Sequence, residues 1–174
     1  MLHAVKNASE TVRTRPASLA DVAQLSGLLS LLFEQEADFT PDAGKQERAL
    51  RMILGNADTG GIFCAESTDG IVGMVSILFL VSTAEGGRVA WLEDMVVLPD
   101  WRDMGIGERL LQEAICGARA AGCLRITLLT DLTNNGAMRF YARSGFVRSR
   151  MTPMRLMLGA AWSGCGGPHD GAAD

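Results

Sequence analysis

The chain has 174 residues and a mass of 18.6 kDa, which suffices for one domain with a sizeable core but not for two domains of ordinary size. Apolar residues make up 48% of the chain and charged residues 21%, and the formal net charge of -4 gives no general attraction to nucleic acid. No apolar run approaches the ~20 residues of a membrane helix, so we expect no membrane insertion and a cytoplasmic location.

Cysteine and histidine usage argues against a disulfide framework and against a metal site. The four cysteines form no CxxC pair, and the two histidines lie near the chain ends. Three of the cysteines, Cys64, Cys116 and Cys123, fall in segments of regular structure, where buried packing roles are favoured over catalysis. Nothing supports a Cys-His or Ser-His nucleophile.

The N-terminal third predicts a flexible arm, a short strand and two helices. Residues 1–11 are polar, and "TVRTRPA" after them alternates as a strand does. The first helix begins at a capping-box-like pair, Ser18 and Asp21, and carries leucines at helical spacing. For the second helix, "TPDAGKQERALRMILGN", we expect Thr40 as the cap and Gly55 as the stop.

The middle of the chain predicts an antiparallel meander. Three strand-like segments, "GIFCAEST", "GIVGMVSILFLVST" and "RVAWLEDMVVL", are separated by "DG" and "AEGG", which are hairpin turn signals.

The C-terminal half predicts one parallel crossover. A helical period runs from Gly105 to Gly122, and the buried strand "LRITLLT" follows it, so this strand and the one before the helix should be parallel neighbours. The segment "NNGAMRFYARSGF" predicts a short helix, with Asn134 or Asn135 near its cap. We expect "FVRSRMTPMRLML" to return as a strand or as a hairpin broken at Pro153, and residues 159–174 to form a flexible tail.

Two glycines mark the junction between the third meander strand and the following helix, in "LEDMVVLPDWRDMGIGERLL". The first amide groups of a helix favour an anion, and glycine lets the backbone approach a phosphate closely. A dinucleotide fingerprint would need glycine where Leu110 stands, and the only Gly-Lys pair is followed by Gln46, not by the Ser or Thr of a P-loop. The alternative is that Gly105 and Gly107 only shape a tight turn.

The order of elements and two motifs resemble the GNAT superfamily of N-acetyltransferases over about residues 12–158. Its Gln/Arg-x-x-Gly-x-Gly/Ala signature fits "RDMGIG", and a second pattern fits through Asn134, Phe140, Tyr141, Gly145 and Phe146. The resemblance implies an α+β, α/β/α sandwich-like fold with about four helices around the sheet. That sheet would be mixed and mostly antiparallel, with one parallel βαβ crossover.

The resemblance also implies acetyl-CoA as co-substrate and no metal. The pyrophosphate of coenzyme A would bind at the signature, and the pantetheine arm would pair with the preceding strand where it splays from "LRITLLT". Asn134 would contact the cofactor too. Many members have glycine where this chain has Asp103, whose carboxylate would repel a pyrophosphate unless it points to solvent or caps the helix. The expected cofactor contacts are Met95, Val96, Val97, Arg102, Asp103, Met104, Gly105, Ile106, Gly107, Glu108 and Asn134.

Direct attack of an amine on the thioester needs a base for the amine and an acid for the departing thiolate. Tyr141, the only tyrosine, matches the position of the family's general acid, with a packed aromatic ring as the alternative. Strand alternation puts Glu93 on the face of Met95 and Val97 and Asp94 on the other. Glu93 is the candidate base, its "LED" context resembles polyamine-type members, and a structural pair with an arginine is the alternative.

The acceptor would enter beside the first two helices, where "FEQEADFTPDAG" is acidic. Glu34 of this stretch is therefore a candidate for binding a small cationic amine, although acidic loops are commonly just solvated. Asp94 of the "LED" strand is a lesser candidate for the same role. A peptide or protein acetyltransferase and a non-catalytic acyl-CoA-sensing or partner-binding module remain as other readings. The family also makes a homodimer conceivable, through the apolar segment "GMVSILFLV".

Overall fold

The computed structural model describes residues 12–35 and 40–158. The expected arm over 1–11, the expected tail over 159–174, and Glu36 and Asp38 of the acidic stretch lie outside these residues. The chain divides into two compact units, Met1–Leu129 and Thr130–Asp174, and each unit is described on its own.

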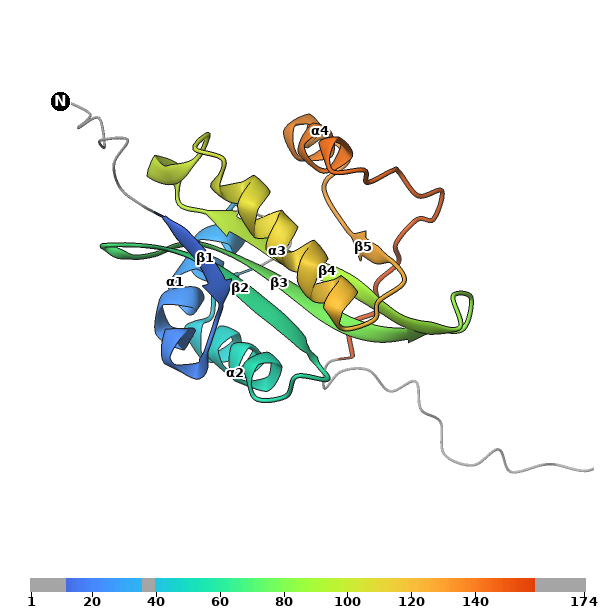
Figure 1. Ribbon diagram of the computed structural model, residues 1–174, viewed down its shortest axis with the longest axis horizontal. Helices are drawn as coiled ribbons and strands as arrows, with labels where there is room; N and C mark the ends of the chain where they lie inside the picture. The colour runs from blue at the N-terminus through green and yellow to red at the C-terminus, as the bar shows by residue number, and fades with distance from the viewer. Residues whose placement is uncertain (1–11, 36–39, 159–174) are drawn as a thin grey trace, which may run out of the picture. The chain divides into compact units, whose positions relative to one another are not determined.

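The first unit is a five-stranded sheet with helices on both faces (Figure 1). Neighbouring strands pair in chain order, antiparallel throughout except for β4 and β5, which are parallel and joined by α3. The predicted α+β fold, the meander and the single crossover are therefore confirmed. In chain order the elements are β1 (Arg13–Pro16), η1 (Leu19–Asp21), α1 (Val22–Phe33), α2 (Ala43–Leu54), β2 (Gly60–Ser67), β3 (Gly70–Ser82), β4 (Gly87–Val97), η2 (Pro99–Trp101), α3 (Ile106–Ala120) and β5 (Ile126–Leu128).

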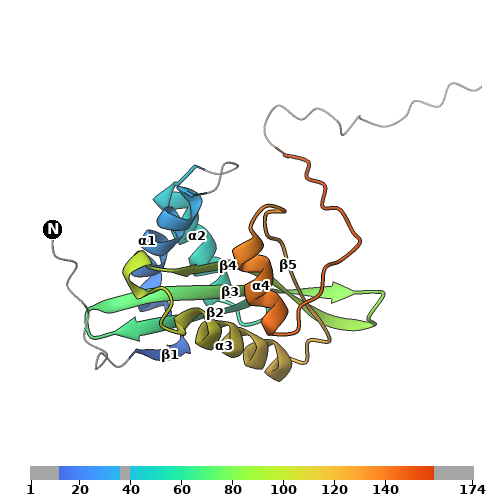
Figure 2. The same cartoon turned by 90° about the horizontal axis from the view of Figure 1, so that it is seen from above.

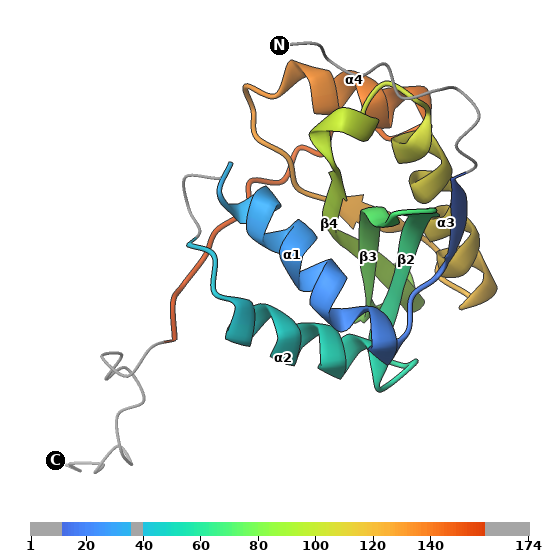
Figure 3. The same cartoon turned by 90° about the vertical axis from the view of Figure 1, so that its left-hand side faces the viewer.

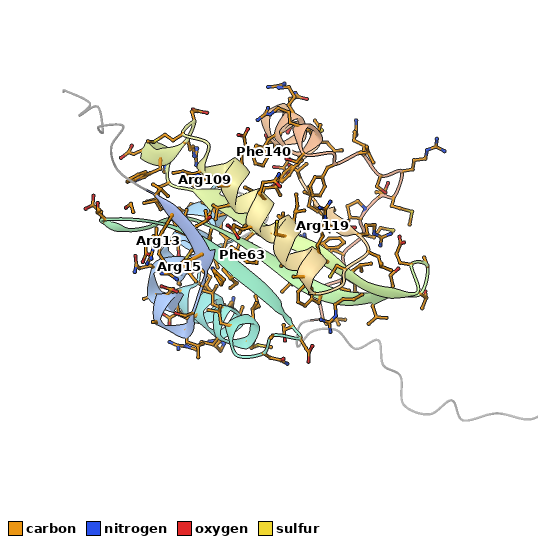
Figure 4. The ribbon with its side chains drawn as sticks, viewed as in Figure 1. Arg13, Arg15, Phe63, Arg109, Arg119 and Phe140 are labelled. Carbon is orange, nitrogen blue, oxygen red and sulfur yellow. The ribbon has the colours of Figure 1, made fainter. Side chains whose placement is uncertain are left out.

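The sheet is covered by α1 and α2 on one face and by α3 on the other (Figures 2 and 3). On the first face, leucines of both helices form a buried cluster with apolar residues of β2, β3 and β4, including Met74 and Val96. On the second face, Phe63 of β2 packs against α3 at Gly117, where a Cβ atom would collide with the ring (Figure 4). These two apolar layers hold β4 and the start of α3 in place.

Two helix starts show how local capping sets the boundaries. The carboxylate of Asp21 accepts a hydrogen bond of 2.7 Å from the backbone N–H of Ser18, as the capping pattern predicts. The expected cap at Thr40 is wrong. Asp42 caps α2 instead, because its backbone is extended and its side chain accepts from the N–H of Lys45 at 3.0 Å.

The second unit contains α4 (Asn135–Arg143), with Asn134 as the predicted cap and a left-handed Gly145 after its end. The strand expected over 146–158 is wrong, because none of these residues adopts strand structure. Apolar alternation alone does not make a strand, since a strand needs a hydrogen-bonded neighbour. The apolar side chains of this segment are exposed instead, among them Val147, Met151 and Met154.

The apolar strand considered for dimerisation, β3, is the central strand of the sheet. Its residues from Ile71 to Ile77 are buried within the unit, and only its far end exposes Leu80 and Val81. None of the helices in the described part of the chain is both long and apolar enough to cross a membrane.

Candidate functional site

A β-bulge interrupts β4 at the "LED" segment. Leu92 lies opposite Ile77 of β3, and Met95 lies opposite Val75, so the two residues between them on β4 face the single residue Ser76. Bulges of this kind increase the local twist and redirect side chains, and they are frequent next to active sites.

The bulge changes which side chains share a face. Val75 and Ile77 are two apart on β3 and point to the same face, so their partners Met95 and Leu92 also share that face. Glu93 and Asp94 both turn to the opposite face, on which Ser76 lies. The expectation that Glu93 shares the face of Met95 is therefore wrong, because simple alternation does not hold through a bulge.

Glu93 and Asp94 lie on the face of the sheet that α1 and α2 cover. Met74, two residues before Ser76 on β3, belongs to the buried cluster beneath these helices. Glu93 is exposed, and within residues 12–35 and 40–129 it forms no ion pair with an arginine. The structural pairing considered for Glu93 is thus absent from this unit, and the carboxylate faces solvent.

Asp94 is held firmly, in contrast to Glu93. The hydroxyl of Ser76 donates to Oδ2 of Asp94 at 3.0 Å, and the backbone N–H of Asp94 donates to the same hydroxyl oxygen at 3.2 Å. Ser76 itself is 1% exposed. Sequence reasoning missed Ser76, although a single polar residue inside the apolar run "GMVSILFLV" was a signal for it.

Pairing between β4 and β5 stops immediately before the bulge. The parallel register covers Ala90, Trp91 and Leu92 of β4 and goes no further. In the part of the chain that the structure describes, no strand pairs with this edge of β4 from Glu93 to Val97. The edge lies where the family resemblance implies that the strand splays from its neighbour.

The loop after β4 is shaped by two left-handed residues. Asp103 has φ 60 and Gly105 has φ 73, and a Cβ atom built on Gly105 would meet nothing within 4 Å. Nε of Arg102 donates to the carbonyl oxygen of Val97 at 3.1 Å, which ties the loop to the end of β4. Asp103 therefore has a left-handed backbone conformation that favours glycine, and aspartate is one of the few other residues that tolerate it.

The loop leads into the N-terminus of α3. Gly105 is the N-cap residue and has no side chain with which to cap the helix, and a helical bond runs from the N–H of Arg109 to the carbonyl of Gly105. The amide groups of the first turn have no acceptor inside a helix and carry positive partial charge. An open Gly105 beside these amides fits a phosphate-bearing group.

The second unit carries Asn134 and Tyr141. Oδ1 of Asn134 accepts from the N–H of Ala137 at 2.9 Å, so its carboxamide oxygen is used to cap α4. The ring of Tyr141 makes edge contacts with Phe140 and Phe146, with centroids 5.1 Å and 5.7 Å away. Burial raises the pKa of the Tyr141 hydroxyl, so this group stays protonated at neutral pH.

The remaining candidates fall outside the β4 and α3 junction. Glu34 is exposed at the C-terminal end of α1, where its N–H donates to the carbonyl of Ser30. Cys64 is buried as expected, and burial raises the pKa of its thiol to about 11, whereas Cys116 is exposed, contrary to the expectation. The described residues contain no cluster of three or more potential metal ligands.

The chain is similar in sequence to a known protein family. The family model described as "Acetyltransferase (GNAT) family" matches residues 27–146. The glucosamine 6-phosphate N-acetyltransferase of Trypanosoma brucei brucei is 34% identical over 98 residues, which are 56% of this chain and 64% of that protein. The chain thus spans less than two thirds of the length of this relative.

Two solved structures share the fold. An integron cassette protein from the mobile metagenome of Cole Harbour Salt Marsh is 27% identical, with a TM-score of 0.74, and the match covers 84% of this chain and 90% of that one. An aminoglycoside N-acetyltransferase, AAC(6')-Iy, solved in complex with CoA, is 17% identical with a TM-score of 0.74. That match covers 87% of this chain and 97% of the other.

Proposed function

Because the chain belongs to the acetyltransferase (GNAT) family, we propose that it transfers acetyl from acetyl-CoA to a primary amine by direct attack in a ternary complex. The acceptor we favour is a small cationic amine. The observation that carries the proposal is the junction of β4 and α3, where the pairing of β4 with β5 ends at Leu92 and a left-handed loop leads to a helix N-terminus with glycine as its N-cap residue.

The signature loop and the first turn of α3 would hold the pyrophosphate of the co-substrate. The backbone amides from Arg102 to Glu108, with Met104, Ile106 and Gly107 between them, are the proposed donors, and Gly105 leaves room for close approach. The strand edge formed by Met95, Val96 and Val97 would pair with the pantetheine arm by main-chain hydrogen bonds. Acetyl-CoA, when bound, supplies the activated acetyl thioester.

Asn134 would add a contact from the second unit. Its carboxamide oxygen caps α4, so this contact would be made by the amide nitrogen as a donor.

We expect Asp103→Asn to bind coenzyme A roughly threefold to tenfold more tightly than the wild-type protein. The change removes one negative charge near the proposed phosphate position, and asparagine also tolerates the left-handed backbone at φ 60. Titration calorimetry at two salt concentrations measures the effect, which should shrink at high salt.

Asp103→Ala is the matched control for backbone strain. It removes the same charge, but alanine is disfavoured at positive φ, so the free energy of unfolding should fall by about 1 kcal/mol. If the asparagine variant binds coenzyme A no better than wild type, the carboxylate of Asp103 points away from the phosphates.

Two side chains are proposed to handle protons. Glu93 is exposed on the face covered by α1 and α2, and we assign it as the base that accepts a proton from the amine, directly or through water. Tyr141 stays protonated at neutral pH because burial raises its pKa, which suits a donor to the departing thiolate.

The shared face of Glu93 and Asp94 supports a positively charged acceptor. Two carboxylates beside the same strand bulge give a local negative potential that favours an ammonium group. Asp42, expected to add to the acidic stretch, caps its own helix instead, so Glu34 is the other described acidic candidate near α1. The polyamine-type reading of "LED" stays a prediction.

The proposal is tested by a coenzyme A release assay with acetyl-CoA and a panel of acceptors. The panel contains spermidine, glucosamine, glucosamine 6-phosphate, kanamycin and a lysine-containing peptide, and thermal shift measures cofactor binding in parallel. We expect turnover with a small amine. Turnover with the peptide alone would favour the protein acetyltransferase reading, and stabilisation by acetyl-CoA without any turnover would favour a binding module.

A further inference from the structure

Two hydrogen bonds join the first half of α3 to the edge strand β1. Nη1 of Arg109 donates to the carbonyl oxygen of Val12 at 2.7 Å, and Oγ1 of Thr14 donates to Oε1 of Glu113 at 2.9 Å (Figure 4). Arg109 and Glu113 are four residues apart, so they are neighbours on one side of the helix. These two bonds, the β1–α3 clamp, therefore fasten two successive turns of the helix to the beginning of the strand.

The carbonyl group of Val12 depends on the arginine. Val12 is 7% exposed, and it precedes Arg13, the first residue of β1 that pairs with β2. A buried carbonyl that lies before the start of the ladder needs a hydrogen-bond partner from elsewhere in the fold. The guanidinium of Arg109 supplies this bond, and a charged donor makes it stronger than a bond from a neutral group.

Apolar packing alone does not fix how α3 is turned on the sheet. The helix buries one stripe of apolar side chains, namely Ile106, Leu110, Leu111, Ala114 and Ala118. Burial of apolar surface has no preferred direction, whereas a hydrogen bond restricts both distance and angle. The clamp therefore restrains rotation of the helix about its axis and sliding along it.

The restraint acts at the end of α3 that carries the signature. The N–H of Arg109 bonds to the carbonyl of Gly105, the N-cap residue, so Arg109 closes the first turn of the helix. Its side chain holds the same turn to Val12. A shift of this turn would redirect the N–H groups before Arg109, because they are part of one rigid helical turn.

We propose that Arg109 is a positioning residue for the co-substrate, which holds the first turn of α3 to the start of β1 so that its amide groups are directed at the pyrophosphate of acetyl-CoA. The inference rests on the proposed function, which assigns the pyrophosphate to these amides. It adds the edge strand as the part of the fold that keeps them in place. In this role Arg109 touches no substrate and acts only through the helix.

Calorimetric titration of Arg109→Met with coenzyme A tests the proposal and needs no identified amine. Methionine keeps an apolar stem and removes the guanidinium, so we expect the Kd for coenzyme A to rise about fivefold. The ratio of the two Kd values should be the same at low and at high salt, because the direction of the amides does not depend on charge screening. A ratio that falls to one at high salt would overturn the proposal in favour of direct attraction between the guanidinium and the phosphates.

Thr14→Val opens the other half of the clamp without changing any charge. It removes the hydroxyl that donates to Glu113, and the Kd for coenzyme A should rise about twofold to threefold. An unchanged Kd in Thr14→Val would overturn the proposal even if Arg109→Met does not fold. Arg119→Met is the charge control, because it removes one positive charge from the last turn of the same helix, roughly 15 Å along the axis from Arg109. Its Kd should match that of the wild type.

Turnover separates positioning from a general loosening of the fold. In the coenzyme A release assay, Arg109→Met should raise the KM for acetyl-CoA and leave the KM for the amine within about twofold of wild type. Equal rises in both KM values would overturn the assignment.

Coenzyme A binding by the wild-type protein distinguishes the two levels of the inference. If the wild type binds no coenzyme A, the proposed acetyl transfer fails, and the role of Arg109 fails with it. If the wild type binds coenzyme A and Arg109→Met binds it equally well, only the role of Arg109 is lost.

Discussion

Replacing Tyr141 by phenylalanine should lower kcat about 100-fold while leaving coenzyme A affinity within about twofold of wild type. The hydroxyl is the only group removed. The ring keeps its edge contacts with Phe140 and Phe146, so the stability of the second unit should change little. Single-turnover acetyl transfer measures the rate, and calorimetry with coenzyme A measures the affinity.

Phe146→Leu is the matched control for this experiment. It removes an aromatic contact to Tyr141 but no hydroxyl. It should therefore lower the thermal midpoint but not cause the large loss of kcat expected for Tyr141→Phe. The pH profile adds a second check. Burial raises the Tyr141 pKa above the ordinary tyrosine value of about 10, so no loss of activity between pH 7 and 9 should come from its ionisation. Wild-type turnover by Tyr141→Phe would remove the tyrosine from the mechanism.

Sequence reasoning reached the fold because the strong local signals agree with the tertiary structure. The capping pair Ser18 and Asp21, the "DG" turn before β3 and the glycines around α3 each act within a few residues. Such short-range preferences survive in the folded chain when the apolar pattern supports them. For the same reason the parallel placement of β5 could be predicted from the length of the crossover.

The predictions from sequence are wrong where the structure of a residue depends on a partner or a backbone conformation that the neighbouring residues do not determine. Alternation predicts opposite faces for Glu93 and Asp94, but the bulge is set by the register against β3. The strand expected over 146–158 has the right apolar pattern and lacks a paired neighbour. Likewise, both Thr40 and Asp42 are good caps, and the backbone conformation decides for Asp42.

In the candidate site, too, local features could be predicted from the sequence and features that depend on distant residues could not. The signature "RDMGIG" predicts the helix start and the position of Gly105, which the structure has at a left-handed N-cap. The left-handed backbone of Asp103 was not foreseen, although the family's usual glycine at this position gave a hint of it. The apolar neighbours of Ser76 mark it as an unusual polar residue, but its hydrogen bond could not be predicted from them, because its partner Asp94 is 18 residues away.

Arg15→Met should lower the free energy of unfolding by about 2 kcal/mol at neutral pH. Arg15 donates to both carboxylate oxygens of Asp21 at 2.9 Å, and it also contacts Glu66 of β2 (Figure 4). The Asp21 side chain is only 9% exposed, so removing the guanidinium leaves a nearly buried carboxylate with Ser18 as its remaining partner. Urea unfolding at pH 7 measures the loss.

Arg13→Met is the control, because Arg13 also pairs with Glu66 but its side chain is 70% exposed. Its removal should cost much less, since exposed ion pairs contribute little. Comparable losses for the two variants would contradict the special role of the pair between Arg15 and Asp21.

The same network predicts how stability depends on pH. The Arg15 guanidinium holds the pKa of Asp21 well below its usual range, and Arg15 and Arg13 lower the pKa of Glu66 to about 2. A carboxyl group with a lowered folded pKa stabilises the fold above its unfolded pKa of about 4 and loses this contribution as the pH falls further. The stability gap between wild type and Arg15→Met should therefore be full at pH 6 and shrink between pH 4 and 2.

The ion pairs of Arg15 with Asp21 and Glu66 also bear on the candidate site. It joins β1 and β2 to the turn that starts α1, and α1 covers the face to which Glu93 and Asp94 turn. Loosening this joint in Arg15→Met should raise the amine KM more than the acetyl-CoA KM, because the start of α3 lies on the opposite face of the sheet from α1 (Figures 2 and 3). Equal changes in the two KM values would mean that the docking of α1 does not shape the acceptor side.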